Sequence, residues 1–249
     1  MPRARVGALF ASGLSAVRRR RLLAMLALAT GAAPAGMDLV NPSCPLARDW
    51  GAPQAMTLIA AERRGKHVLI ADGIVDATLP DRLKAALAGD ERIEEVWLRS
   101  RGGDAHAGNL AGRVIRSFPG MATRIPAGWT CFSACNFVFM GGDRRYVDPG
   151  GVFMVHMFTH TGNHDAIELS VSEGTAETTR LIGEIEQSSA LLASEDNDFL
   201  IRMGVSRKLL TEVMYRQQAV ATAANAATHY CLTQEEVRRY NVMPRETAG

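Results

Sequence analysis

The chain has 249 residues, 47% of them hydrophobic and 22% charged, a composition typical of globular proteins and sufficient for one large domain. Its formal charge is +2, but the first 35 residues contain six arginines and no carboxylate, so the remaining residues carry −4. This net negative charge argues against nucleic acid as a partner.

The first 35 residues have the organisation of a signal peptide. Arg3, Arg5 and the run Arg18–Arg21 form a positive n-region, residues 22–29 form an apolar h-region, and Ala33-Pro34-Ala35 supplies the small residues of a cleavage site. The apolar run is shorter than the roughly 20 residues that a membrane-spanning helix needs. We therefore expect a periplasmic or secreted protein; the alternative is an anchor formed by an uncleaved N-terminal segment.

The mature chain begins with a segment that has no clear hydrophobic period. Residues 36–55 contain three prolines and are interpreted as an extended leader, which one domain over residues 56–249 follows. The domain opens with two apolar or alternating runs, residues 56–62 and 67–75, separated by a short basic turn, and this pattern predicts a hairpin.

Strands and helices then alternate along the chain. Helical spacing of apolar residues follows Thr78, includes Leu110 to Ile115, and begins again at Ser133. The intervening strands are expected at residues 95–99, 121–126, 145–147 and 152–158. Beyond Ala166 the pattern is helical, and the chain closes with a short strand and a helix capped by Thr233. The alternation predicts an α/β domain with a mostly parallel sheet and crossover helices.

Four cysteines remain after the predicted cleavage site: Cys44, Cys131, Cys135 and Cys231. An even number in an exported protein suggests two disulfides, for which three pairings exist. We favour Cys131 with Cys135, which are close in sequence, and Cys44 with Cys231, which would tie the two ends together. One alternative is that Cys131 or Cys135 is a reactive thiol. Zinc binding is disfavoured because there is no CxxC pair.

Ser133 is the candidate nucleophile. It follows a turn and starts a helix, so the amide of Ala134 would point outward at the positive end of that helix. The Gly102-Gly103 turn ends a neighbouring strand and allows a backbone amide to approach a substrate carbonyl, and His156 suits a general base. Each has a simpler interpretation: a serine N-cap, a tight turn and a hydrogen-bonded core histidine.

Together these segments resemble the ClpP and crotonase superfamily of serine peptidases and acyl-CoA enzymes. The resemblance covers residues 56–242 and is carried by four segments: residues 96–103, 128–135, 153–156 and 232–237. It implies a spiral of repeated ββα units with a helical C-terminal segment. It also implies Ser133 as nucleophile, His156 as base, and an oxyanion hole formed by Gly102, Gly103 and Ala134. The Cys-x-Ser-Ala-Cys setting and the leader are similar to a group of periplasmic ClpP-like proteins.

The sequence departs from that family at the acid of the triad. A ClpP-like acid comes shortly before the closing segment, where residues 225–230 contain no carboxylate. Asn225 could orient His156 through its amide, or Asp196 or Asp198 could reach it from the long helical segment. A serine-lysine dyad is disfavoured because the few lysines are far from Ser133 in the expected fold; they are Lys66, Lys84 and Lys208.

No metal and no cofactor are expected. His156, His160 and His164 recur every four residues, but that spacing aligns side chains only on a helix, and residues 152–158 are predicted as strand. The resemblance implies a serine peptidase that assembles as a homo-oligomer. Export would place it in the periplasm, where ATP is not supplied, so we expect it to lack an ATP-driven unfoldase and to act on peptides or unfolded chains. The alternatives are a non-catalytic binding or assembly protein of the cell envelope and, less favoured for an exported chain, an acyl-CoA enzyme.

Overall fold

The computed structural model describes residues 36–161, 163–218 and 227–244. The predicted signal peptide and Asn225 lie outside these ranges. No helix of the described residues is both long enough and apolar enough to cross a membrane.

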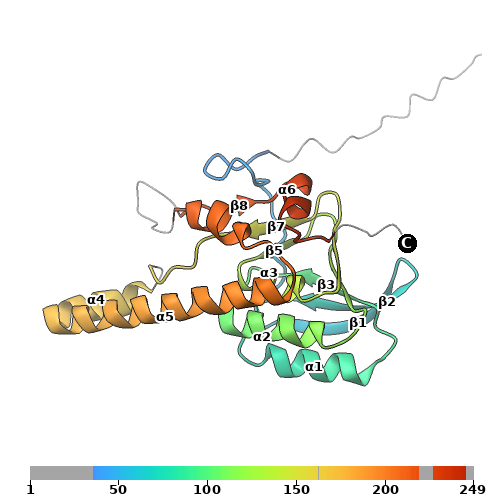
Figure 1. Cartoon of the computed structure of the whole chain (residues 1–249), viewed down its shortest axis with the longest axis horizontal. Coiled ribbons are helices and arrows are strands. Elements are labelled where there is room, and N and C mark those ends of the chain that lie inside the picture. The colour runs from blue at the N-terminus through green and yellow to red at the C-terminus, as the bar shows by residue number, and fades with distance from the viewer. Residues whose placement is uncertain (1–35, 162, 219–226, 245–249) are drawn as a thin grey trace, which may run out of the picture. The chain divides into compact units, whose positions relative to one another are not determined.

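The main sheet has five strands in the order β1-β2-β3-β4-β6 (Figure 1). Their bounds are β1 Thr57–Arg63, β2 Lys66–Asp72, β3 Glu95–Arg99, β4 Ala122–Ile125 and β6 Arg144–Val147. β1 and β2 form the antiparallel hairpin that the sequence predicts, and the other neighbours pair in parallel. This is the crossover arrangement expected from alternating strands and helices.

A second, three-stranded sheet carries the candidate chemistry. Its strands are β5 Thr130–Phe132, β7 Val152–Val155 and β8 Tyr230–Cys231, in the order β5-β7-β8. β5 and β7 run parallel, so the ends that precede Ser133 and His156 lie side by side. The strand predicted at residues 152–158 ends earlier than expected, and His156 is the first residue beyond it.

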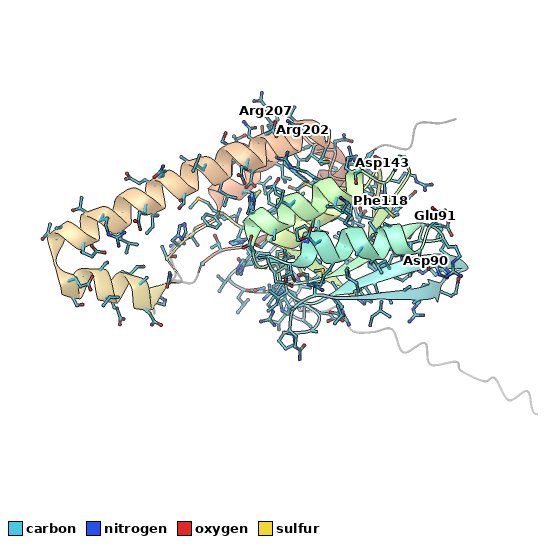
Figure 2. All side chains as sticks on the ribbon, turned by 90° about the horizontal axis from the view of Figure 1, so that it is seen from below. Asp90, Glu91, Phe118, Asp143, Arg202 and Arg207 are labelled. Atoms are coloured by element: carbon cyan, nitrogen blue, oxygen red, sulfur yellow. A yellow bond between two sulfur atoms is a disulfide. The ribbon has the colours of Figure 1, made fainter. Side chains whose placement is uncertain are left out.

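Six α-helices accompany the sheets in the described residues: α1 Leu79–Gly89, α2 Ala105–Arg116, α3 Ala134–Met140, α4 His164–Glu173, α5 Thr175–Arg202 and α6 Gln234–Arg239. All seven residues of α3 are buried, which fits a sequence that is apolar except for Asn136 and places the helix in the core. Figure 2 shows α1, α2 and the end of α5 that carries Arg202 lying over one face of the main sheet. The repeated strand-helix plan and the helical C-terminal segment confirm the predicted α/β fold class.

The helical segment after residue 200 differs from the prediction in detail. Beyond Ser206 the chain forms a π-helical turn at Leu209–Val213 and then a 3-10 turn at Met214–Arg216, rather than a regular α-helix. The closing helix α6 begins at a capping box, in which the Thr233 hydroxyl accepts from the amide of Glu236 and the Glu236 carboxylate accepts from the amide of Thr233.

The leader is attached to the second sheet. Cys44 is bonded to Cys231 of β8, and the Thr130 amide of β5 donates to the Asp49 carbonyl. The ring of Trp50 packs edge-on against Phe132, with centroids 5.5 Å apart. Residues of the leader therefore contribute to the surroundings of the strand that precedes Ser133.

Candidate active site

Ser133 occupies a sharp turn between β5 and α3. Its backbone has φ 56° and ψ −124°, a left-handed conformation that a non-glycine residue rarely adopts. Although it stands at the N-cap position of α3, its side chain makes no capping hydrogen bond. A strained strand-to-helix turn that presents a free hydroxyl is the geometry of a nucleophile elbow.

Two features hold this turn. Cys131 and Cys135, which lie on either side of Ser133, are fully buried and joined by a disulfide. The Asn136 amide group of α3 donates to the Met154 carbonyl of β7 at 2.6 Å, so the helix that follows Ser133 is bonded to the strand that precedes His156. Asn136 was not predicted as a site residue; its signal in the sequence is a single amide within an otherwise apolar helix.

His156 lies against the Ser133 hydroxyl. Its Nε2 is 2.7 Å from Ser133 Oγ. Burial, together with the charge of His229, lowers the pKa of His156, and a hydrogen bond with the Met157 backbone partly opposes them, so that the pKa is about 4. The ring is therefore neutral at neutral pH. With its proton on Nδ1, Nε2 is able to accept the serine proton.

The Gly102-Gly103 turn packs directly against the serine turn. A Cβ on Gly102 would lie 2.7 Å from both the Phe132 carbonyl oxygen and Ser133 Cβ, so only glycine allows this approach. The Gly102 amide donates to the buried Ser100 hydroxyl at 3.0 Å. Among the described residues, the amides of Gly103 and Ala134 have no hydrogen-bond partner, so these two amides are available to a substrate oxygen.

The two aspartates considered as the third member of a catalytic triad differ in their surroundings. Asp198 forms surface ion pairs with Arg202 at 2.8 Å and Arg113 at 3.3 Å. Asp196 is only 7% exposed, and its Oδ1 accepts from Asn109 Nδ2 at 2.8 Å. Neither carboxylate is hydrogen-bonded to His156.

His229 is the residue of the 225–230 stretch that approaches His156. The two ring centroids are 6.1 Å apart, and the Phe132 ring lies 4.6 Å from the first and 5.0 Å from the second. Nδ1 of His229 is buried with no partner in the described part of the chain. Burial lowers the pKa of His229, and the charge of Arg48 lowers it further. A histidine thus lies in the stretch where the family resemblance places the acid of the catalytic triad.

A small space of about 20 Å³ opens beside Ser133 and His156. A larger cavity of about 240 Å³ adjoins it. The two share four lining residues: Phe158, Leu192, Asp196 and Met214. Asp196 therefore faces the same cavity as the serine and the histidine.

The other histidines and the lysines take no part in this arrangement. His160 Nε2 is 3.2 Å from the Ser188 hydroxyl, and His164 begins α4. Lys66 forms an ion pair with buried Glu95. Across residues 36–161, 163–218 and 227–244, no three His, Cys, Asp or Glu side chains are grouped closely enough to hold a metal ion.

No protein-family model matches the chain, and no curated protein matches it. A mutant of ClpP1 from Listeria monocytogenes is 13% identical, with 70% of this chain and 86% of that chain covered and a TM-score of 0.47. A mutant of the 1510-N membrane-bound stomatin-specific protease is also 13% identical, with 68% and 73% covered and a TM-score of 0.43. ClpP1 from Listeria monocytogenes is 12% identical, with 70% and 86% covered and a TM-score of 0.43. At such low identity the likeness concerns the fold alone.

Both predicted disulfides, Cys44–Cys231 and Cys131–Cys135, are present, and the described residues contain no free cysteine. Paired cysteines persist in oxidising compartments, so the two bonds indicate an exported protein.

Proposed function

We propose that the chain is an exported, periplasmic serine hydrolase that cleaves peptides or unfolded chains. The observation that carries the proposal is the 2.7 Å contact between His156 Nε2 and Ser133 Oγ at a strained turn whose hydroxyl caps nothing. A neutral imidazole at hydrogen-bond distance is the group that a serine needs to become a nucleophile. The choice of peptides rests on the sequence resemblance to ClpP.

In this mechanism Ser133 Oγ attacks the substrate carbonyl carbon while its proton passes to His156 Nε2. The amides of Gly103 and Ala134 receive the resulting oxyanion, and Gly102 contributes by having no side chain against the turn. His156 then gives the proton to the leaving amine as the carbon–nitrogen bond breaks. A water molecule, deprotonated by the same histidine, hydrolyses the acyl-enzyme and restores Ser133.

We further propose that the protein assembles as a homo-oligomer and works without an ATP-driven unfoldase. ATP is not supplied outside the cytoplasm, so the substrates would be short peptides or chains that are already unfolded.

A fluorophosphonate probe tests the nucleophile directly, with the purified full chain kept oxidised. The wild type should be labelled, Ser133→Ala should not, and His156→Gln should react at least a hundredfold more slowly. Ser172→Ala, which alters an exposed serine of α4, is the matched control and should react like the wild type. An unlabelled wild type, or equal labelling of Ser133→Ala, would refute the proposal.

A non-catalytic envelope protein is the second candidate. It is favoured by one observation: no carboxylate among the described residues is hydrogen-bonded to His156. Full complementation of a deletion strain by the Ser133→Ala protein would support this candidate and exclude catalysis as the cellular role.

A further inference from the structure

The cavity beside the serine is large enough for one long side chain. Its volume is about 240 Å³, and Leu192, Met214 and Phe158 give it apolar walls. These three also line the small space at Ser133 and His156, so the cavity opens where the reacting carbonyl would lie. A side chain next to that carbonyl would enter it.

Asp196 is the acidic residue of this cavity. It lies one helical turn after Leu192 on α5, which places both side chains on the same face of the helix. One carboxyl oxygen accepts the Asn109 bond, while the other has no partner in the described part of the chain, and the side chain is 7% exposed. A buried carboxyl with an unused oxygen faces the cavity that a substrate would fill.

No cation in the described part of the chain compensates this carboxyl. Among the described residues, Asp196 forms no ion pair, and the neighbouring charge that acts on it is Glu195, of the same sign. Tyr215, on the same cavity wall, has its own pKa raised by burial and by Asp196. Burial above all raises the pKa of Asp196 to about 7. Ionising a buried carboxyl that has no ion-pair partner is costly. A positive group brought by a substrate would offset that cost.

We propose that this cavity is the specificity pocket for the residue whose carbonyl is attacked, and that Asp196 selects a lysine or arginine side chain there. The proposal rests on Ser133 being the nucleophile. An aliphatic stem would pack against Leu192 and Met214, and the terminal cation would pair with the unused carboxyl oxygen. An uncharged side chain leaves that oxygen unpaired, and an acidic one is repelled.

Protection of Ser133 from the fluorophosphonate probe by tripeptide aldehydes provides the test. The aldehydes differ only at the last residue: lysinal, argininal, norleucinal, which has the lysine stem without the amine, and glutamal. With the wild type, lysinal or argininal should protect at concentrations at least tenfold lower than norleucinal, and glutamal should protect least. In Asp196→Asn this preference should disappear.

Asp198→Asn is the matched control, because it removes the same charge from the same helix at a surface ion pair. It should keep the wild-type preference. If lysinal and norleucinal protected the wild type equally while the probe still labelled it, the pocket assignment would be overturned and the serine-hydrolase proposal would be unaffected. A preference that survives in Asp196→Asn would also overturn it. A wild type that the probe does not label would overturn both proposals.

Discussion

Replacing Asp196 by asparagine should stabilise the folded protein at alkaline pH. The substitution keeps the shape of the side chain and an oxygen for the Asn109 bond, but it removes a carboxyl that is 7% exposed and faces no cation. Burial raises the pKa of Asp196 from its ordinary 3.8 to about 7. At about 1.4 kcal/mol for each pH unit, the ionised carboxyl costs the folded state up to about 4 kcal/mol.

The direction of the pH dependence follows from that shift. Because the folded pKa of Asp196 lies above the unfolded one, the folded state binds more protons between pH 3.8 and about 7. The stability that the protonated carboxyl contributes is complete below this window and is lost as the pH rises through it. The variant has no such loss. His156, whose pKa is lowered to about 4, contributes in the opposite direction, but it is present in both proteins and cancels in their difference.

Urea denaturation followed by tryptophan fluorescence, from pH 5 to pH 8.5 with the disulfides intact, measures this difference. The free energy of unfolding of Asp196→Asn minus that of the wild type should increase by about 2 to 3 kcal/mol over this range, because at about 1.4 kcal/mol per pH unit only the part from pH 5 to about 7 contributes. Asp198→Asn, at a half-exposed position with ion pairs, should show no such increase. A difference for Asp196→Asn that stays flat or falls with pH would refute the reasoning.

Three further predictions concern the serine turn and its base. Gly102→Ala should reduce fluorophosphonate labelling at least a hundredfold, because the added Cβ would lie 2.7 Å from backbone and side-chain atoms of that turn at φ +88°; wild-type labelling rates would contradict this. His229→Gln should raise the pKa of His156 from about 4, because the charge of His229 lowers it. The pH below which the labelling rate falls should therefore move upward. An unchanged pH profile would argue against an electrostatic interaction between the two histidines. Replacing Cys131 and Cys135 together by alanine should lower the free energy of unfolding by about 2 kcal/mol, the loop-closure value for so short a loop, and should slow labelling. Denaturation midpoints measure the first effect and probe kinetics the second. If neither the stability nor the labelling rate changed, the disulfide would not support the turn.

The segments of the site could be predicted from the sequence because each has a local signature. Apolar periodicity followed by a change of period marks a helix that begins after Ser133, and paired glycines mark a turn at Gly102. The disulfides were predicted from an even number of cysteines in a chain that the sequence predicts to be exported. Local patterns of this kind are fixed by a few neighbouring residues, so they survive in the folded molecule.

The partners of those segments could not be predicted, because they are set by packing between distant elements. Asn109 and Asp196 are 87 positions apart and meet only because α2 packs against α5. The Gly102 amide is occupied by Ser100, a hydroxyl that no periodicity singles out. The strand before His156 is three residues shorter than the pattern suggests, since pairing with β5 ends at Met154 and pairing with β8 ends at Val155.

Burial shifts the pKa values of His156 and Asp196 in opposite directions, and this affects how the proposed site would work. Desolvation lowers the pKa of His156 and raises that of Asp196, because in each case it disfavours the charged form. At neutral pH the cavity therefore holds a neutral base and a carboxyl that is only partly ionised. A cationic substrate side chain would change this balance, because it would ionise Asp196 and bring its own compensating charge. Binding energy and selectivity would then both come from the Asp196 carboxyl, whereas the serine proton would pass to His156.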